Sequence, residues 1–263
     1  MGIKPLKKFG QNYLIDKNIV QNMIRPLNLQ SSDNVIEIGP GKGFITEEIY
    51  KLVDKVTGIE IDSRVIKNLE ENFPNLRLIH SDFLKINLRS YVDKNKLKII
   101  GNIPFNLTGN ILFKLLDEAA NIESAILIVP HDIAKRIIAK KKTKEYGILT
   151  ILFNYFTTPK IVQKVSSNVF LPKPNLDAAI LQINFNKEEE PNLDKNLFIK
   201  VVKASFGNRR KTLNNSLRNS IFNNCDFSGL NLPLTKRAEE FNVEEFIELT
   251  KYIQNSLWQK KTK

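Results

Sequence analysis

The stretch Val35-Ile36-Glu37-Ile38-Gly39-Pro40-Gly41-Lys42-Gly43 decides the fold of this chain. Asn34–Ile38 is short and mostly apolar, and it runs directly into a turn that holds three glycines. A helix-compatible stretch follows at Gly43–Leu52. Glycine lets a backbone pass close to a ligand, and the first turn of a helix offers unpaired N–H groups. We therefore expect a buried strand, a ligand-binding turn and a helix, with Gly39 and Gly41 as candidate ligand-binding residues.

Three kinds of ligand compete for this turn. A nucleotide P-loop requires G-x-x-x-x-G-K-[ST], but Ile36 stands at the first glycine position and Gly43 follows Lys42 where serine or threonine is needed. A dinucleotide fingerprint is G-x-G-x-x-G, whereas this stretch is G-x-G-x-G. S-adenosylmethionine has no pyrophosphate and is compatible with the acidic Glu37 beside the turn. For the motif alone, an ordinary strand–helix turn without a ligand stays an alternative.

The spacing of apolar segments predicts an α/β fold. Short β-rich runs recur along the first half of the chain, and helix-compatible stretches such as Ser63–Asn72 separate them. This alternation is typical of a mostly parallel sheet covered by helices. Tyr146–Phe156 is expected to be a helix, and Lys160–Lys164 and Ala178–Phe185 are expected to pair antiparallel at one edge of the sheet. The expected parallel strands are Asn34–Ile38, Lys55–Ile59, Leu76–His80, Leu97–Ile100 and Ala125–Val129.

A change in composition after residue 186 predicts a second domain. Asn186–Asn192 is charged, contains Pro191 and holds no apolar residue, as is typical of a linker. Beyond it, apolar residues follow helical spacing. We expect an α/β domain over residues 1–186 and a small all-helical domain over residues 187–263. The expected helices of the second domain are Leu197–Phe206, Thr212–Phe222, Leu234–Phe241 and Val243–Trp258.

Polar residues recur at the ends of the predicted parallel strands. Gly39, Glu60, Asp82 and Asn102 end or follow four successive strands, so a parallel sheet places them at one edge, where open α/β sheets bind ligands. Glu60 can accept hydrogen bonds from both ribose hydroxyls of a nucleoside, and Asp82 can accept one from an adenine amine. Asn102 can both donate and accept. Any one of these residues alone is equally well explained as a solvated loop residue.

The segment Gly101–Asn106 is the most specific motif. The exocyclic amine of adenine is a poor nucleophile, because its lone pair is delocalised into the ring. Acceptors on its two N–H groups, from the Asn102 side chain and a neighbouring backbone carbonyl, can hold the nitrogen toward tetrahedral geometry. Pro104 fixes the loop that presents this carbonyl, and Phe105 offers a face for stacking, worth ~1–3 kcal/mol per base. The alternative is a strand-end turn with a core phenylalanine.

Phe170 is a second aromatic candidate, within Asn168–Pro174. Two prolines stiffen this segment, and we expect them to hold Phe170 outward, where it closes on the other face of the target base. A proline-rich loop anchored by a buried phenylalanine explains the same letters equally well.

The charge of the chain indicates a polyanionic partner. Lys and Arg number 40 against 28 Asp and Glu, a formal charge of +12, which a Lys-rich compositional bias also explains. Arg209, Arg210 and Lys211 stand at the start of a predicted helix, where the helix dipole disfavours cations, so we expect them to bind RNA phosphates. Lys140–Lys144 is either a second RNA-facing loop or a solvated one.

Several protein classes are disfavoured by what the sequence lacks. Cys225 is the single cysteine, which fits a cytosol-like compartment, and no run of about 18 apolar residues predicts a membrane span. The first residues have no signal-peptide core. His80 and His131 lie far apart and without cysteine pairs, so we expect no metal. We expect a cytoplasmic protein that does not bind membranes.

Five segments together resemble the rRNA adenine N(6),N(6)-dimethyltransferase family, and the match extends from residue 4 to about residue 220. The resemblance implies a class I, Rossmann-like S-adenosylmethionine methyltransferase fold, a mostly parallel sheet and a small helical C-terminal domain. It also implies donor contacts at Asn12, Leu14, Gly39, Glu60, Asp82 and Asn102. The five segments are Phe9–Leu14, Glu37–Gly43, Gly101–Phe105, Val169–Pro174 and Phe206–Leu213.

Within that family the sequence looks most similar to the bacterial small-subunit enzyme. This similarity implies dimethylation of two adjacent adenosines in a hairpin near the 3′ end of small-subunit rRNA, in a pre-30S particle, by a monomer. Ile103 and Phe105 stand where the family usually has leucine and tyrosine, and phenylalanine keeps the stacking face. Leu176–Ala178 and Val129–Asp132 also depart from the family pattern.

Three alternatives from other classes stay open. An erythromycin-resistance methyltransferase modifies an adenosine of large-subunit rRNA, but the stretch Arg209–Leu213 favours the small-subunit enzyme. A non-catalytic ribosome assembly factor of this fold is disfavoured by the intact Glu60, Asp82 and Asn102. A dehydrogenase is disfavoured by the glycine spacing.

Overall fold

The structure, a computed structural model, describes residues 10–188 and 190–261. These residues form two compact units. The first comprises the described residues up to Ala134 together with Thr157–Asn186, and the second comprises Lys135–Phe156 with the described residues from Lys187 onward.

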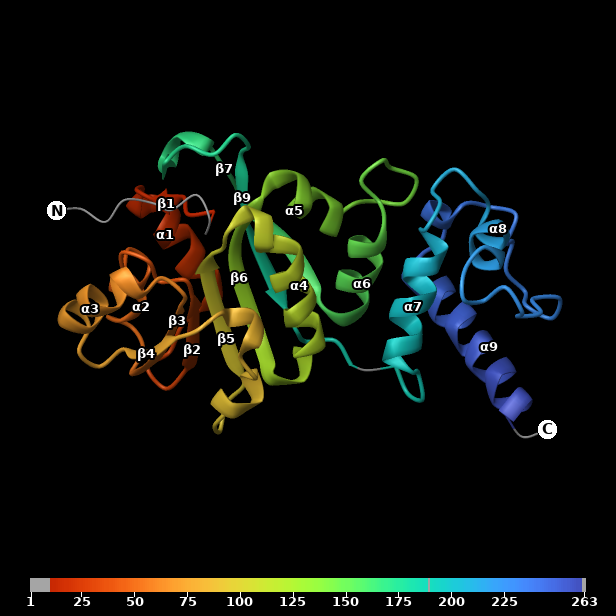
Figure 1. Cartoon of the computed structure of the whole chain (residues 1–263), viewed down its shortest axis with the longest axis horizontal. Helices are drawn as coiled ribbons and strands as arrows, with labels where there is room; N and C mark the ends of the chain where they lie inside the picture. Colours follow the sequence, from red (N-terminus) through yellow and green to blue (C-terminus); the bar gives the residue numbers. More distant parts are fainter. Residues whose placement is uncertain (1–9, 189, 262–263) are drawn as a thin grey trace. The chain divides into compact units, whose positions relative to one another are not determined.

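A seven-stranded sheet forms the centre of the first unit, in the order β4-β3-β2-β5-β6-β9-β7 (Figure 1). The first five strands in this order run parallel, and β9 pairs antiparallel with β6 and with β7. The predicted α/β class and the antiparallel edge are therefore confirmed. The strands are β2 (Asn34–Ile38), β3 (Lys55–Glu60), β4 (Arg77–His80), β5 (Leu97–Asn102), β6 (Ile122–Pro130), β7 (Thr158–Val165) and β9 (Ala178–Asn184).

Helices cover both faces of this sheet. Val35, Val56 and Ile126 belong to one buried apolar cluster with Met23 and Leu69, which come from the helices α1 and α3. On the other side, α4 (Thr108–Asp117) packs against β6 and lies in front of the sheet in Figure 1. The other helices of this unit are α1 (Lys17–Ile24), α2 (Thr46–Ile49) and α3 (Ser63–Asn72), and α5 (His131–Ile137) begins in this unit and ends in the second.

Short elements connect the sheet to its surroundings. β1 (Tyr13–Leu14) pairs antiparallel with β8 (Phe170–Leu171), which ties the first described residues to the loop after β7. Single turns of 3-10 helix follow several strands. They are η2 (Arg25–Leu27), η3 (Phe83–Lys85), η4 (Leu88–Tyr91), η5 (Phe105–Leu107), η6 (Ala119–Asn121) and η7 (Ser167–Val169).

The second unit is helical around an aromatic core. The ring centroids of Tyr155 and Phe198 lie 4.4 Å apart, and those of Phe206 and Phe246 lie 5.8 Å apart. Aromatic pairs at this separation add to the free energy gained from burial. The elements of this unit are α6 (Ile148–Phe156), α7 (Lys195–Ser205), α8 (Leu213–Arg218), η8 (Ala238–Glu240) and α9 (Val243–Lys261).

Residues 135–156 differ from the expected division of the chain. The sequence placed them in a domain over residues 1–186, but they form one compact unit with the helices after residue 187. The hydroxyl of Tyr146 donates to the carbonyl of Phe241 at 2.7 Å, and Tyr155 packs on Phe198. No proline-rich or charged linker marks residue 135, so composition carried no signal for this boundary.

Three expected helices differ from the prediction: two are shorter, and one does not form. In place of Gly43–Leu52 the structure forms α2 over Thr46–Ile49, because the turn before it uses glycines with positive φ. In place of Thr212–Phe222 it forms α8 over Leu213–Arg218. The predicted helix Leu234–Phe241 is wrong. The carbonyls of residues 234 and 236 accept hydrogen bonds from residues 214 and 213, and only η8 is helical.

Among the described residues, no helix is both long enough and apolar enough to span a membrane.

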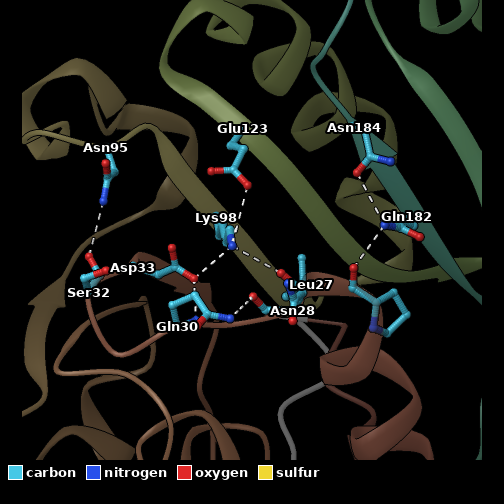
Figure 2. Close-up of polar contacts among 11 residues, drawn as sticks. Leu27, Asn28, Gln30, Ser32, Asp33, Asn95, Lys98, Glu123, Gln182 and Asn184 are labelled. Carbon is cyan, nitrogen blue, oxygen red and sulfur yellow. Dashed lines mark hydrogen bonds and ion pairs between the residues drawn. The ribbon is translucent and has the colours of Figure 1, made fainter.

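Lys98 is a buried cation near the amino-terminal end of the sheet (Figure 2). Its Nζ donates to Asp33 Oδ2 at 2.8 Å and to the Leu27 carbonyl at 3.2 Å, and it lies 3.5 Å from Glu123 Oε1. The side chains of Lys98 and Asp33 are only 7% and 11% exposed. This ammonium group therefore links β5 to three other parts of the unit: the segment before β2, the segment after α1, and β6.

We expect Lys98→Met to lower the free energy of unfolding by about 3–5 kcal/mol, because it leaves the Asp33 carboxylate buried with the Gln30 N–H as a donor but without its cationic partner. Lys55→Met is the matched control, since Lys55 and Asp93 form an equally short pair that is more than half exposed. Exposed pairs contribute about 0–1 kcal/mol. Urea unfolding measures both changes, and equal losses for the two variants would contradict the role given to Lys98.

Candidate active site

A cavity of about 320 Å³ opens at the carboxyl ends of the parallel strands. This volume suits a small organic ligand. Its wall is built from β1, the turn after β2, the ends of β3 and β5, the segment after β4, and β8. The structure brings nine sequence-predicted residues together in this wall: Asn12, Leu14, Gly39, Gly41, Glu60, Asp82, Asn102, Pro104 and Phe105.

The glycine turn after β2 needs its glycines for conformation and for space. Gly39, Gly41 and Gly43 all have φ between +57° and +82°, a region that residues with a Cβ rarely adopt. A Cβ on Gly41 would approach the Tyr13 ring to 3.1 Å. A Cβ on Gly39 would meet no atom within 4 Å, so the backbone there borders open space that a ligand can occupy.

Glu60 ends β3 as an almost fully buried carboxylate. Its Oε2 accepts a hydrogen bond from the Gly41 N–H at 2.9 Å, and its Oε1 accepts one from the Asp62 N–H at 2.8 Å. Burial raises the pKa of Glu60, while these two bonds lower it. The bonds fix the carboxylate in the wall of the cavity, and each oxygen keeps a lone pair for a further donor.

Asp62 fixes the segment after β3. Its carboxylate accepts two bonds from the Arg64 side chain and one from Gln11 Nε2 at 3.0 Å. The Arg64 guanidinium holds the pKa of Asp62 at about 2. Because Gln11 precedes β1, its hydrogen bond to Asp62 also anchors the N-terminal segment against the β3 end of the cavity.

Glu37 lies beneath the glycine turn and is fully buried. Its Oε2 accepts a hydrogen bond from the Thr46 hydroxyl at 2.7 Å. The pKa of Glu37 is raised to about 8, chiefly by burial; the Thr46 hydrogen bond opposes this shift and the nearby Glu60 carboxylate adds to it. The carboxyl group therefore holds a proton at neutral pH and can ionise when a cation occupies the cavity.

Asp82 stands where β4 ends and begins η3. Its Oδ1 accepts a hydrogen bond from the Leu84 N–H at 2.9 Å. No hydrogen bond to Oδ2 is found within residues 10–188 and 190–261, so this oxygen is available to an amine in the cavity.

Asn102 ends β5 with its amide group fixed in orientation. Nδ2 donates to the Asn12 carbonyl at 2.7 Å. This bond leaves Oδ1 as an acceptor that faces no protein donor in the described part of the chain. Gly10 packs beside the same loop, where a Cβ would come within 2.4 Å of Asn106 Oδ1. The N-terminal segment therefore supports the loop after β5.

The backbone carbonyls of the loop after β5 differ in whether the protein already donates a hydrogen bond to them. The Pro104 carbonyl accepts hydrogen bonds from the Leu107 N–H at 3.0 Å and from the Thr108 hydroxyl at 3.4 Å. No hydrogen bond to the Ile103 carbonyl is found among the described residues. The backbone acceptor expected beside Asn102 is therefore Ile103, and Pro104 serves to shape the turn. Phe105 is half-buried and borders the cavity.

The expectation that Phe170 points outward is wrong. Its side chain is 2% exposed and belongs to the apolar core. Side chains alternate along a strand, and β8 directs Phe170 inward and Leu171 outward. Leu171 is 60% exposed and borders the cavity, which Phe170 does not.

Sequence reasoning missed an apolar rim around this cavity. Ile15, Ile61 and Leu171 are exposed side chains of three separate segments, and all three border the cavity. A contiguous exposed apolar patch typically marks a binding surface. The pairing of β1 with β8, which places Leu171 here, has no motif in the sequence.

The remaining predicted residues lie in the second unit. Arg209, Arg210 and Lys211 follow α7 and are exposed. Arg209 contacts the Lys144 carbonyl and the Glu239 carboxylate, whereas Arg210 and Lys211 form no ion pair within the described residues.

The hydrogen-bond acceptors in the cavity wall fit a nucleoside that carries positive charge. The carboxyl groups of Glu37, Glu60 and Asp82 all line this cavity, and the glycine turn leaves room for close approach of a ligand. S-adenosylmethionine, with a ribose, an adenine amine and a sulfonium, matches these acceptors.

Solved structures share this fold. A dimethyladenosine transferase from Plasmodium falciparum superposes with a TM-score of 0.77 at 24% identity, covering 92% of this chain and 98% of that one. The structure of the 23S rRNA methyltransferase ErmE gives a TM-score of 0.67 at 25% identity and covers 92% of this chain and 100% of that one. The fold and the cavity define a Rossmann-like methyltransferase with a helical C-terminal region.

Sequence comparison gives the family. The model for ribosomal RNA adenine dimethylase matches residues 3–255. A protein of Chlorobium phaeobacteroides named ribosomal RNA small subunit methyltransferase A is 39% identical over 93% of this chain and 92% of its own length. A Clostridium botulinum protein of the same name is 35% identical over 95% of this chain and 94% of its own length. This chain belongs to the ribosomal RNA adenine dimethylase family.

We expect Glu37→Gln to remove a pH dependence of stability. The folded-state pKa of about 8 exceeds the ordinary value of 4.5, so the folded protein binds more protons between these values. The stability contribution of protonated Glu37 is complete below pH 4.5 and is lost as the pH rises through 8, by at most about 1.4 kcal/mol per pH unit. Glutamine cannot ionise and lacks this loss.

Urea unfolding of the wild type and of Glu37→Gln at pH 5.5 and 8 measures the difference. Glu71→Gln, at an exposed position of α3, is the control and should follow the wild type. If wild type and Glu37→Gln lose the same stability between the two pH values, the buried acid is not the source.

Proposed function

We propose that this enzyme transfers methyl groups from S-adenosylmethionine to the exocyclic amines of two adjacent adenosines in a hairpin near the 3′ end of small-subunit rRNA. The enzyme would act on a pre-30S particle during small-subunit biogenesis, as a monomer. The observation that carries this proposal is the cavity that joins the glycine turn, Glu60 and Asp82 to the unpaired oxygen of Asn102.

Binding of the methyl donor is proposed from the hydrogen-bond acceptors in the cavity wall. Glu60 accepts the ribose hydroxyls with the lone pairs that its two backbone partners leave free, and Asp82 Oδ2 accepts from the adenine amine. Asn12 and Leu14 close this side through β1. When bound, S-adenosylmethionine supplies a methyl group already activated by its sulfonium.

The acceptor side is proposed around Asn102. Asn102 Oδ1 and the Ile103 carbonyl accept the two N–H groups of the target amine and hold its lone pair toward the methyl group. Phe105 stacks on the base, because it borders the cavity beside this loop. The sulfonium needs no further activation, so alignment supplies much of the rate, and no strong general base is required beside the amine.

The small-subunit substrate is favoured over the large-subunit one by the relatives. Proteins 35–40% identical to this chain over nearly its whole length carry the name ribosomal RNA small subunit methyltransferase A, whereas the large-subunit enzyme ErmE is 25% identical. Incubation with labelled donor and separated small and large ribosomal subunits, followed by mapping of the modified nucleotides, tests the choice. Modification of large-subunit rRNA alone would overturn it.

We expect Asn102→Ala to bind S-adenosylmethionine while methyl transfer falls by about 100-fold or more, because the variant loses the side chain that aligns the amine. Asn110→Ala is the control, since Asn110 is exposed on the neighbouring helix α4. Calorimetry with the donor and a radiolabelled methyl assay measure the two effects separately. Near-wild-type turnover of Asn102→Ala would refute the alignment mechanism.

We expect Leu171, rather than Phe170, to contact the RNA side of the cavity. Leu171→Ala should reduce methyl transfer several-fold and leave the free energy of unfolding within about 0.5 kcal/mol of wild type, because the side chain is exposed. Phe170→Ala should lower that free energy by about 3–5 kcal/mol, as for other buried aromatic residues. A Leu171→Ala enzyme with unchanged kcat/KM for RNA would contradict this assignment.

A further inference from the structure

Helix α4 contacts two segments that border the cavity. It begins at Thr108, directly after the loop that follows β5, and the Thr108 hydroxyl donates to the Pro104 carbonyl at 3.4 Å. The same helix packs against η3, within the segment of residues 82–88 that starts at Asp82. One helix therefore connects the loop proposed for the target amine to the segment proposed for the adenine of the methyl donor.

Lys114 makes the contacts from α4 to the segment of residues 82–88. Its Nζ donates to the Ile86 carbonyl and lies 5.8 Å from the centroid of the Phe83 ring. Phe83 follows Asp82 directly and borders the cavity, whereas Lys114 is not part of the cavity wall. The Lys114 side chain is only 15% exposed. This ammonium group is therefore fixed behind the wall, against the residue next to Asp82.

Glu118 stands one helical turn after Lys114 and holds the other end of the segment. Its Oε1 lies 3.3 Å from Lys114 Nζ and accepts a hydrogen bond from the Leu88 N–H at 3.2 Å. Its Oε2 accepts one from Asn121 Nδ2 at 2.9 Å. A buried backbone group without a hydrogen-bond partner costs free energy, so the donor at Lys114 and the acceptor at Glu118 favour one position of the segment.

Asp82 depends on this segment for its orientation. Its Oδ1 accepts a hydrogen bond from the Leu84 N–H at 2.9 Å, and its carbonyl accepts one from the Lys85 N–H at 2.9 Å. Both donors belong to η3, so the direction of Oδ2 follows the placement of this turn. Hydrogen bonds weaken steeply when their geometry is poor, and a displacement of about 1 Å removes much of their contribution. Contacts that fix η3 therefore affect how an amine binds to Asp82.

We propose that Lys114 is a positioning residue for the methyl donor: together with Glu118 it holds the segment of residues 82–88 where Asp82 meets the adenine amine. Lys114 touches neither the donor nor the target base, and it acts through Asp82. The proposal rests on the proposed function, which assigns Asp82 to that amine. It also gives a role to a lysine that no sequence motif singles out.

Lys98 offers a matched comparison within the same unit. Both lysine side chains are largely buried, and each ammonium group donates to one backbone carbonyl and lies against a carboxylate. Lys98 is the second residue of β5, whereas the cavity opens at the carboxyl ends of the strands. Methionine at either position removes a buried cation, so both variants should lose stability. Only Lys114→Met should change what the cavity binds.

Two ligands that differ at the base measure the position of Asp82. S-adenosylhomocysteine carries an exocyclic amine there, and S-inosylhomocysteine carries an oxygen, which a carboxylate repels. Calorimetry gives the ratio of their affinities. We expect the wild type to favour the adenosyl compound by about tenfold or more, as for other hydrogen bonds to charged groups. Lys114→Met should reduce this ratio by about threefold or more, and Lys98→Met should keep it.

A double-mutant cycle shows whether Lys114 acts through Asp82. Asp82→Asn should lower the ratio, because an amide can meet either an amine or an oxygen, and Lys114→Met should lower it no further in that background. Lys114→Arg keeps a cation that can donate to the Ile86 carbonyl, so it should restore most of the ratio. In methyl transfer, Lys114→Met should raise KM for the donor and leave kcat within about threefold of wild type, since the loop after β5 is unchanged.

Thermal unfolding checks that each variant is folded. If Lys114→Met does not fold, Glu118→Gln takes its place, because glutamine keeps an acceptor for the Leu88 N–H and removes the charge that faces Lys114. An equal drop in the ratio for Lys114→Met and Lys98→Met would show a general effect of lost stability and overturn the inference. An additive effect in the Asp82→Asn background would do the same.

Failure of this inference differs from failure of the proposed function. A wild-type enzyme that methylates small-subunit rRNA and favours the adenosyl compound, with the same ratio in Lys114→Met, would overturn the inference alone. A wild-type enzyme that binds both compounds equally would remove the role of Asp82 and the inference with it. A wild-type enzyme that methylates no small-subunit rRNA would overturn the proposed function, whatever the ratio in Lys114→Met.

Discussion

The rest of the structure depends on a close approach between β2 and β5. Gly101 pairs with Ile38, and a Cβ on Gly101 would lie 2.8 Å from the Ile38 carbonyl. Only glycine permits this distance, and it sets the two strand ends side by side. Gly39 follows Ile38, and Asn102 follows Gly101. The pairing register of β2 and β5 therefore places the methyl-donor side of the cavity beside the side proposed for the target amine.

Two opposite charge distributions coexist in this basic chain. The cavity of the first unit gathers buried or half-buried carboxylates, which suit a sulfonium nucleoside and repel phosphate. The second unit gathers exposed lysines and arginines around an acid that is already paired. Ligand binding can change the charge of Glu37, because a carboxyl group with a pKa of about 8 can ionise when a cation enters the cavity.

The sequence predicted those features that periodicity and residue type control. The five parallel strands, the antiparallel edge and seven residues of the cavity wall follow from strand length, glycine spacing, the polar strand ends and the motif after β5. Asn12 and Leu14 were implied by the family resemblance alone. Features that depend on distant pairing were not predictable. Residues 135–156 join the second unit through aromatic contacts, and the segment 234–236 pairs with the start of α8 instead of forming a helix. Neither contact leaves a local pattern.

Phe170 and Arg209 show where a family motif stops being informative. A motif transfers the identity of a residue, but the direction of its side chain depends on the element that contains it. Pairing of β8 with β1 fixes the alternation at Phe170 and Leu171, so the aromatic ring enters the core and the aliphatic neighbour borders the cavity. At Arg209, one carbonyl and one carboxylate occupy the guanidinium group. In both cases the surrounding structure, and not the motif, decides which side chains are available to a ligand.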